Sequence, residues 1–492
     1  MSNLTRFSAA LVLALPAAGQ LRLETRAQVI VQVPRAVDRT GVEASLERGG
    51  WRVLEELPAL GLLLVEVPLT QGLASAIARL SATPGVAFAE ANGSGEGGEI
   101  VPNDTHFGVQ WPLDNRGQGG GRAGADIEAL RAWSLARGSA AVTVAVLDSG
   151  LTPAHPEFAG RVLPGIDFVN EDADPFDDQG HGTFVSGILA ANADNAFGLA
   201  GVDHACALLP VKVLNQFNGG TVFDLTQGLV FAADAGAHVV NMSLINYPQT
   251  TALESALEYA RNAGCVLVAC AGNGGIGDAD RSYPGRSPLT ISVGATTDRD
   301  LRAVFSGTGN SLDLVAPGER VPATLRALTD GWTAFSGCSA ATPIVSGMAA
   351  VLLSVDPTLT HDEIKQRLEA GAEDGVGSAA DTPGRDNHYG HGRANLFRSL
   401  CLLDTGGPSI VAPAVLRLES PGPGGLSADD PAVIAALKSI LAVDDLDPAP
   451  RLQVVSPGPL PLGKLVALAV TALDACGHAT QRTLEIIAED RG

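Results

Sequence analysis

The sequence is poor in basic residues and in cysteine, and each shortage excludes a class of protein. Its 32 Lys+Arg stand against 54 Asp+Glu, which gives a formal net charge of −22 without any basic cluster. Because nonspecific binding to nucleic acid depends on neutralising phosphates, we expect no nucleic-acid partner. Six cysteines in 492 residues are too few for a disulfide scaffold, and none has the paired C-x-x-C spacing of a zinc site. Their spacing does not tell which of them pair.

Hydrophobic residues make up 46% of the chain and charged residues 17%, a balance typical of globular proteins rather than disordered ones. The length suggests about three domains. Composition and length do not identify an activity, so the function must be inferred from the sequence motifs.

The N-terminus has the pattern of a signal peptide. Arg6 precedes an apolar run over residues 7–18 that is too short to span a bilayer, and Ala17 and Gly19 are small residues suited to cleavage after Gly19. This predicts a signal peptide over residues 1–19 and a secreted protein, extracellular or periplasmic; the alternative is a buried N-terminal strand or helix. We identify no other uncharged apolar run of 18 residues, which predicts no membrane span.

The rest of the chain divides into three regions by its pattern of apolar residues. The first, over residues 27–92, alternates strand-like runs (29–33, 62–67 and 86–89) with helical ones (37–48 and 72–81), which predicts a small α+β unit. A glycine-rich linker over 93–98 follows it.

From about residue 101 to 400, continuous apolar runs alternate with helical stretches. The runs lie at 142–147, 208–213, 239–242, 266–269 and 290–293, and the helical stretches at 183–191, 225–235, 252–263 and 341–354. Continuous apolar strands between helices predict an α/β domain whose parallel sheet has helices on both faces. The last region, over 401–492, is rich in Pro and Gly between strand-like runs and predicts a small β-sandwich, with a helix over 431–441 as the alternative there.

Three residues of the α/β region stand where acid–base and nucleophilic groups belong. Asp148 follows the strand over 142–147, at the carboxyl end where reactive groups gather in an open parallel sheet. His181 lies between two glycines at the start of a helix. Ser339 begins another helix, and Pro343 indicates the first turn of that helix. Because the backbone N–H groups at a helix N-terminus are free, they favour a developing oxyanion beside Ser339. Taken singly, the three residues are as typical of a turn, a structural histidine and an N-cap serine.

Together, the motifs around these residues resemble a known family. V-A-V-L-D-S-G over 144–150, H-G-T-F-V-S-G over 181–187 and G-C-S-A-A-T-P-I-V-S-G over 337–347 resemble the three signatures of the subtilisin-like serine proteases, in the chain order Asp, His, Ser. Further matching segments lie at 102–107, 209–214, 239–244, 268–273, 315–318 and 389–395. The resemblance covers about residues 100–400 and implies a subtilisin-like catalytic domain.

The resemblance implies a secreted serine endopeptidase that cleaves polypeptides through an acyl-enzyme. Ser339 would be the nucleophile, His181 the general base and then acid, and Asp148 the residue that orients the imidazole. Asn273 would donate its side-chain amide to the oxyanion beside the Ser339 N–H. Substrate would add as an extended strand between two edges, formed by Ser243, Leu244 and Ile245 and by Asn218, Gly219 and Gly220. Ile245 replaces a glycine that usually lines the primary pocket, and it would narrow that pocket's mouth.

Four other positions depart from the family pattern. Cys338 replaces the usual Thr before the nucleophile, Ala340 replaces the usual Met after it, and Phe184 and Ile344 each replace a common histidine. Because all four chemical positions are kept, we interpret these departures as variation rather than loss of activity.

Two acidic sets are candidate structural calcium sites. Asp167, Asn170, Asp172 and Asp174 offer closely spaced oxygen ligands, and some calcium-stabilised subtilases carry ligands in this loop. A solvated acidic loop explains the same residues equally well. The second set resembles another family site, with Asp104, Glu157 and Asn195 as ligands and Glu157 in place of the usual Asp.

The resemblance also implies a domain order. Residues 20–97 resemble an inhibitor-type propeptide with a ferredoxin-like fold, 98–400 the peptidase, and 401–492 an immunoglobulin-like module of the hyalin-repeat type. The propeptide would inhibit its own enzyme until cleavage within about 91–101, and we expect a monomer. The alternative function is a catalytically silent subtilase-fold protein that binds a peptide or cell-surface ligand. The four intact chemical positions argue against it. For the last module, a stabilising spacer is the alternative to adhesion.

Overall fold

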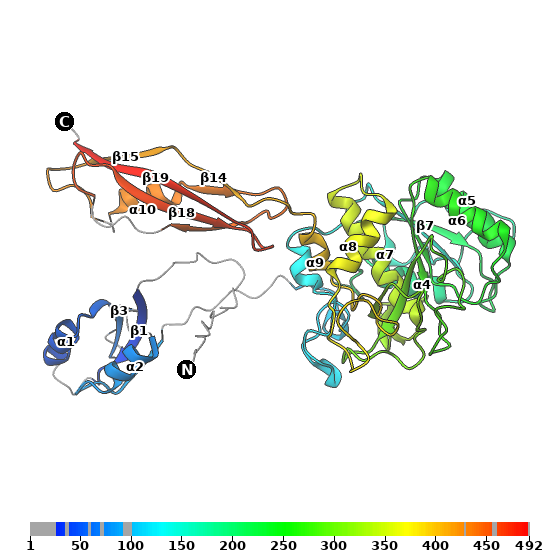
Figure 1. The fold of residues 1–492 in the computed structure, drawn as a ribbon, viewed down its shortest axis with the longest axis horizontal. Coiled ribbons are helices and arrows are strands. Elements are labelled where there is room, and N and C mark those ends of the chain that lie inside the picture. The colour runs from blue at the N-terminus through cyan, green and yellow to red at the C-terminus, as the bar shows by residue number, and fades with distance from the viewer. Residues whose placement is uncertain are drawn as a thin grey trace, which may run out of the picture. The chain divides into compact units, whose positions relative to one another are not determined.

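The structure, a computed structural model, describes residues 26–34, 39–57, 61–68, 73–91, 101–427, 430–454 and 460–490. The predicted signal peptide and the linker over 93–98 lie outside these residues. The chain divides into two compact units. The larger holds residues 99–406 with 445–448, and the smaller holds the segments that precede and follow it in the sequence. Figure 1 shows the described segments, coloured along the sequence.

The described residues before 92 form a four-stranded antiparallel sheet with two helices. Its elements are β1 (Arg26–Gln32), α1 (Arg39–Arg48), β2 (Arg52–Leu57), β3 (Leu62–Pro68), α2 (Leu73–Ser81) and β4 (Phe88–Ala91), in the sheet order β2-β3-β1-β4. Val29 and Val31 on β1 and Leu63 and Val65 on β3 are buried in alternation, as the period of a half-buried strand requires. The element order is that of a ferredoxin-like unit, as predicted. The sequence analysis missed β2, because three of its six residues are charged.

The larger unit is built on a seven-stranded sheet whose paired strands are all parallel, which confirms the predicted α/β class. The strands are β5 (Thr143–Asp148), β6 (Ile166–Asp167), β7 (Ala207–Lys212), β8 (Val239–Met242), β9 (Val266–Cys270), β10 (Ile291–Thr296) and β11 (Leu314–Pro317). Their order is β11-β10-β9-β8-β5-β7-β6. The order reverses at β5, and the crevice at such a switch point is where open α/β sheets bind ligands.

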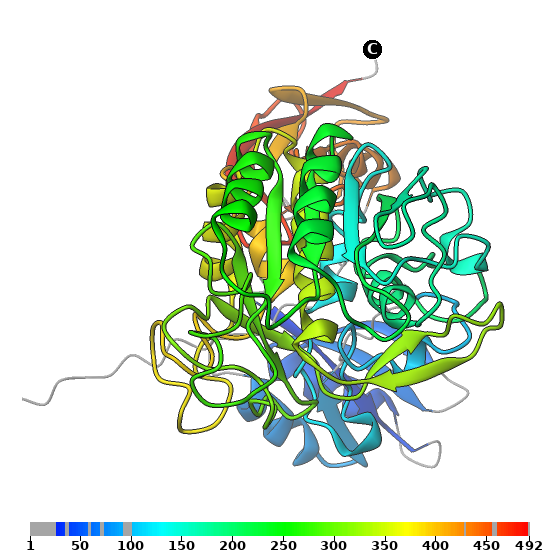
Figure 2. The ribbon, with the colours of Figure 1, turned by 90° about the vertical axis from the view of Figure 1, so that its right-hand side faces the viewer.

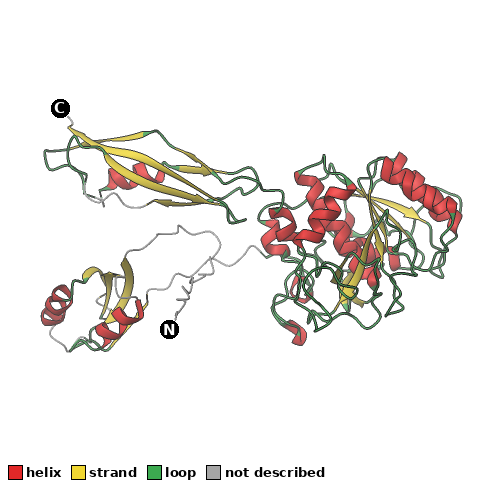
Figure 3. Ribbon diagram, in the orientation of Figure 1, coloured by secondary structure: helices red, strands yellow, loops and turns green. Residues whose placement is uncertain are grey.

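Helices cover both faces of this sheet (Figures 2 and 3). They are α3 (Ala129–Trp133), α4 (His181–Ala190), α5 (Val222–Asp234), α6 (Thr251–Asn262), α7 (Cys338–Val355), α8 (His361–Gly371) and α9 (Leu396–Cys401). The side chains of β5 alternate between two cores. Val144 and Val146 pack in the core that contains α4 and α7, whereas Ala145 and Leu147 pack in the core that contains α5 and α6. Three short 3-10 helices (Phe107–Val109, Gln118–Gly120 and Pro156–Phe158) and a hairpin of β12 (Val321–Thr324) and β13 (Trp332–Phe335) complete the unit.

Helix α7 corrects one prediction from the sequence. Cys338–Val355 is an uncharged 18-residue helix with a mean hydropathy of 1.7, so the expectation that no other uncharged apolar run reaches 18 residues was wrong. Its apolar character follows from its place in the interior, where 89% of these residues are buried between the sheet and neighbouring helices. A helix that is apolar on all sides is typical of a buried position in a large domain.

The described residues after 407 form two sheets and one helix around a common apolar core. The elements are β14 (Ser409–Val411), β15 (Val415–Ser420), α10 (Pro431–Lys438), β16 (Leu441–Val443), β17 (Arg451–Val454), β18 (Val466–Leu473) and β19 (Ala479–Asp490). One sheet has the order β15-β19-β18-β17, and the other pairs β14 with β16. Ile410 of β14 packs in one core with Leu468 of β18 and Ile486 of β19. The alternative helix near 431–441 is therefore realised as α10.

Candidate active site

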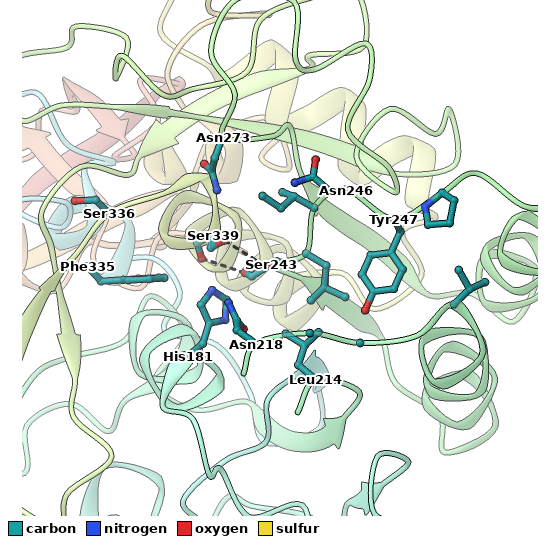
Figure 4. Close-up of a pocket in the computed structure, with 16 residues that line it drawn as sticks. His181, Leu214, Asn218, Ser243, Asn246, Tyr247, Asn273, Phe335, Ser336 and Ser339 are labelled. Carbon is teal, nitrogen blue, oxygen red and sulfur yellow. Dashed lines mark hydrogen bonds between the residues drawn. The ribbon is translucent and has the colours of Figure 1, made fainter. Parts of the chain in front are cut away.

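The catalytic candidates converge on the carboxyl edge of the central strands. Asp148 is the last residue of β5, at the switch point of the sheet. His181 is the first residue of α4, and Ser339 is the second residue of α7. Asn273 follows β9, whose carboxyl end lies at the same edge. Figure 4 shows His181, Ser339 and Asn273 around one hollow.

Asp148 and His181 form a hydrogen-bonded pair with little access to solvent. The distance from His181 Nδ1 to Asp148 Oδ1 is 2.7 Å, and the side chains are 12% and 0% exposed. Because a carboxylate only accepts, Nδ1 carries the proton and Nε2 is left as the basic nitrogen. Burial of the imidazole lowers its pKa, but the charge and hydrogen bond of Asp148 and the charge of Asp177 outweigh burial, so the pKa of His181 is raised.

Asp177 fixes the loop before His181, a role that the sequence analysis missed. Its buried carboxylate accepts the Oγ–H of Ser149 (2.8 Å), the N–H of Gly180 (2.7 Å), and both the N–H and the Oγ1–H of Thr183 (2.9 and 2.6 Å). This ties the residue after Asp148 to the first turn of α4. The sequence carries no separate signal for Asp177, because it stands in a run of similar acidic residues.

Ser339 is 7% exposed, and its hydroxyl faces the end of β8. Its Oγ donates to the carbonyl of Ser243 at 3.2 Å (Figure 4), and it lies 3.6 Å from Cys270 Sγ. The hydroxyl is therefore engaged with Ser243 rather than His181 in this structure. Catalytic hydrogen bonds are often loose without substrate, and a rotation about the Cα–Cβ bond redirects a serine hydroxyl.

Pro343 lies in the second turn of α7 rather than in the first, which corrects the position predicted from the sequence. Helix α7 begins at Cys338, so a residue at position 343 would normally donate its N–H to the carbonyl of Ser339. Ser243 replaces that donor, because its Oγ donates to the Ser339 carbonyl at 3.0 Å. Asn241 Nδ2 in turn donates to Ser243 Oγ at 3.1 Å. The backbone of the nucleophile is thus held by β8 and the residues that follow it.

Asn273 is oriented as an amide donor. Its Oδ1 accepts the N–H of Cys338 at 2.8 Å, which leaves the Nδ2 group free to point into the hollow beside Ser339 (Figure 4). The N–H of Ser339 lies in the first turn of α7, where backbone donors have no intrahelical acceptor. Two donors at this point can stabilise a negative charge that develops on a carbonyl oxygen.

This arrangement predicts a large effect of an Asn273→Ala variant. We expect kcat to fall by about 10²- to 10³-fold with little change in KM, because the lost amide would act mainly on the transition state. Steady-state kinetics on a peptide substrate measure both parameters. The matched control is Asn246→Gly, which removes an amide from the same hollow at a position whose φ of 63° suits glycine, and we expect kcat to stay within a fewfold there. An equal fall of kcat in both variants would contradict the role of Asn273.

The hollow has a volume of about 480 Å³ and contains every predicted substrate-binding residue. Ser243, Leu244 and Ile245 line one side and Asn218, Gly219 and Gly220 another, together with His181, Asn273 and Ser339. The sequence analysis missed seven further lining residues, which are Leu214, Val222, Asn246, Tyr247, Pro248, Phe335 and Ser336. The two edges meet closely, because a Cβ at Gly220 would lie 2.4 Å from Tyr247 Oη.

The cysteines beside the nucleophile are buried thiols. Cys338 Sγ donates to the carbonyl of Gly272 at 3.0 Å, and burial raises the pKa of Cys338 to about 11. Burial also raises the pKa of Cys270. Because the thiolate is the reactive form, neither thiol competes with the serine hydroxyl at neutral pH.

The second predicted calcium set fits a cation. Glu157 is fully buried, its Oε1 accepts the N–H of Leu199 at 2.6 Å, and its Oε2 accepts Asn195 Nδ2 at 3.2 Å. Burial raises the pKa of Glu157 to about 7 and also raises that of Asp104. Asp104 Oδ1 is buried without a hydrogen-bond partner among the described residues. A spare carboxylate oxygen beside a second buried carboxylate suits a hard divalent cation.

The first predicted set forms a self-contained turn. Asp167 Oδ1 accepts the N–H groups of Val169 (2.7 Å) and Asn170 (2.9 Å), and its Oδ2 accepts Asn170 Nδ2 (2.8 Å). Asp172 Oδ1 accepts the N–H of Asp174 at 2.9 Å, and both of these side chains are exposed. Among the residues that the structure describes, no three carboxylates of this loop lie within ligand distance of one another. Hydrogen bonds alone account for this loop.

Comparisons with known proteins identify relatives of the larger unit and of the segment that precedes it. The subtilase family model matches residues 139–392, and the model of the fervidolysin N-terminal prodomain matches residues 25–92. A thermophilic serine proteinase of Bacillus sp. (strain AK1) is 36% identical over 301 residues, which cover 61% of this chain and 69% of that protein. Thermitase of Thermoactinomyces vulgaris is 35% identical over 274 residues, which cover 56% and 93%. Among solved structures, a protease from Pseudoalteromonas arctica PAMC 21717 has a TM-score of 0.54 at 26% identity and covers 61% of this chain and 99% of its own.

Proposed function

Because the chain belongs to the subtilase family of serine proteases and carries a prodomain, we propose that Asp148, His181 and Ser339 form the catalytic triad of an endopeptidase made as a zymogen. The observation that carries this proposal is the 2.7 Å pair of His181 and Asp148 facing the same hollow as Ser339.

The proposed reaction uses each group at a stated atom. His181 Nε2 accepts the proton of Ser339 Oγ while that oxygen attacks the scissile carbonyl, and Asp148 stabilises the imidazolium that forms. Asn273 Nδ2 and the Ser339 N–H donate to the oxyanion of the tetrahedral intermediate. His181 then gives its proton to the leaving amine. Water, activated by the same nitrogen, hydrolyses the acyl-enzyme and restores Ser339.

The substrate polypeptide would bind as an extended strand between two walls of the hollow. One wall is the glycine-rich segment over 218–220, and the other is the segment over 243–245 that follows β8. Ser243, Leu244 and Ile245 follow the end of β8, and among the described residues the backbone groups of Leu244 and Ile245 make no hydrogen bond, so an added strand can pair with them. Ile245 is half-buried and faces the hollow, which supports the proposal that it narrows the primary pocket.

The prodomain supports a maturation step. We place cleavage within about residues 91–101, after β4, and we propose that the segment over 20–97 inhibits the enzyme until that cleavage. Export through a signal peptide over 1–19 and an immunoglobulin-like module over 401–492 complete the proposed architecture. The shared core of the two C-terminal sheets supports a β-sandwich there. Peptide hydrolysis by the purified protein, and its dependence on Ser339, tests the function.

We also propose a structural Ca²⁺ held by Asp104, Glu157 and Asn195. When bound, the cation would neutralise the two buried carboxylates and join the segment around Asp104 to the loop that carries Asn195. Asn195 Oδ1 now accepts the N–H of Phe197 at 2.9 Å, so ligation by Asn195 exchanges that hydrogen bond for a bond to the metal. The triad itself needs no metal.

Thermal unfolding tests this site. Adding Ca²⁺ to chelated protein is expected to raise the midpoint temperature by several degrees, because a cation that binds the folded state alone stabilises it. A Glu157→Gln variant is expected to lose this response, whereas Asp172→Asn in the other acidic set keeps it. Calorimetry in an inactive Ser339→Ala background avoids self-digestion. The reverse pattern, with the response lost only in Asp172→Asn, would place the cation in the acidic loop instead.

A further inference from the structure

A second hollow lies beside the active site on the far side of the His181 loop. It has a volume of about 450 Å³ and is open to solvent. Phe176, Phe184, Leu325 and Ala327 supply apolar surface, and Gly180 and Arg326 also line it. Phe176 is 47% exposed, so much of its apolar surface faces solvent rather than other residues of the chain.

A row of three rings connects this hollow to the catalytic histidine. The ring of Phe335 packs edge-on against His181, with centroids 5.3 Å apart and planes at 87°. Phe335 also packs against Phe184, with centroids 5.6 Å apart. Because Phe335 lines the first hollow and Phe184 lines the second, the aromatic pair forms a shared wall between them.

The position of this wall tells which part of a substrate reaches it. In Figure 4, Phe335 lies on one side of His181 and Ser339, whereas Tyr247 and Leu214 lie on the other. The two strand edges proposed to hold the acyl part of the substrate reach the side of Tyr247, because residues 243–245 lead directly to Tyr247 and a Cβ at Gly220 would lie 2.4 Å from Tyr247 Oη. The leaving amine must lie at His181 Nε2 to receive its proton, so the chain on the leaving-group side continues past Phe335.

We propose that Phe184, with Leu325 and Phe176, forms a pocket that selects an apolar side chain on the leaving-group side of the scissile bond. This inference rests on the proposed function and adds a substrate preference to it. The occupant is an aliphatic or aromatic side chain of the polypeptide, because the lining is apolar and continues the wall that begins at the catalytic histidine.

Charge adds a second element of selection. Among the described residues that line this hollow, Arg326 is the one that carries a charge, and its Nη1 donates to the backbone carbonyl of Asp177 at 3.0 Å rather than to a carboxylate. A guanidinium held there disfavours a lysine or arginine at the same substrate position. Burying a leucine-sized side chain in an open apolar hollow favours it over glycine by about tenfold.

Capture of the acyl-enzyme by added amines isolates the leaving-group side. A peptide methyl ester acylates Ser339 and releases methanol, after which either water gives the acid or an added amine attacks the ester carbonyl, forms an amide bond and frees the Ser339 hydroxyl. Leu-Gly-amide places leucine at the first position after the scissile bond, and Gly-Leu-amide places it at the second. Gly-Gly-amide is the reference for both. We expect the wild type to prefer leucine over glycine by about tenfold at one of these positions, and Phe184→Ala or Leu325→Ala to reduce the ratio to about twofold.

The ratio of capture by a leucine amide to capture by Gly-Gly-amide does not depend on the amount of active enzyme. It can therefore be measured even for a variant that folds only in part. The control is Val355→Ala, which removes an exposed apolar side chain at the other end of α7, about 24 Å from Ser339, and is expected to keep the wild-type ratio. If the wild type shows no preference, or if Phe184→Ala and Leu325→Ala both keep it, the pocket is wrong while the triad stands. If the wild type turns over no ester at all, the proposed function is wrong and the pocket with it.

Discussion

A Ser339→Ala variant is expected to keep its N-terminal segment and to lose peptide hydrolysis by about six orders of magnitude. The size follows from the way a triad acts as a unit, since loss of the nucleophile in subtilisin removes nearly all of the triad's contribution. The wild type, by contrast, is expected to release a fragment that ends within about residues 91–101. Intact mass of both proteins, expressed with Ca²⁺, measures the processing, and a fluorogenic peptide measures the hydrolysis.

The matched control is Ser336→Ala, three residues earlier in the connection between β13 and α7. Ser336 Oγ accepts the N–H of Arg320 at 2.8 Å and has no role in the proposed chemistry. We expect this variant to mature normally and to stay within about tenfold of wild-type activity. If neither the wild type nor Ser339→Ala matures or hydrolyses peptides, the silent binding protein becomes the better interpretation. Equal maturation of both would assign the cleavage to another protease.

An Asp148→Asn variant is expected to lower kcat by about 10⁴-fold and to move the acid limb of the pH profile. The amide can donate to Nδ1, which favours the tautomer whose proton sits on Nε2 and removes the base. The pKa of His181 is raised by Asp148 against the effect of burial, so wild-type activity rises as pH increases through that raised value. Without the carboxylate the pKa falls, and the limb shifts to lower pH.

The pH profile of kcat/KM, measured on wild type and variant, reports this shift. The control is Asp178→Asn, which neutralises a neighbouring acid that pairs with Lys212 at 2.8 Å and lies 38% exposed. We expect that variant to keep the position of the acid limb. A limb that stays in place in Asp148→Asn would show that another group sets the protonation of His181.

Much of the catalytic region was predictable from the sequence, because its signals are local. The strand before Asp148 is a continuous apolar run, and the helices at His181 and Ser339 begin at motifs that identify the family. These features depend on residues a few positions apart. Residue type and order were therefore enough to place Asp148, His181, Ser339 and Asn273 near one edge of the sheet.

The partners of these residues were not predictable, because they come from distant parts of the chain. Ser243 supplies the donor that Pro343 cannot, although it lies 96 residues before Ser339. The contact of Phe184 with Phe335 likewise joins two segments that share no motif. Asp177 resembles its acidic neighbours until the five groups that donate hydrogen bonds to its carboxylate are known. Such roles depend on the folded arrangement rather than on residue type.

The burial of helix α7 links the nucleophile to the cooperative unfolding of the whole domain. Ser339 sits at one end of a helix that is packed on nearly all sides, so local fraying cannot displace the hydroxyl without opening the central core. The backbone amides of this helix should therefore exchange with solvent only through large-scale opening, whereas surface loops exchange freely. An enzyme built this way would remain active until the temperature at which its core melts, and it would then lose catalysis and structure in one step.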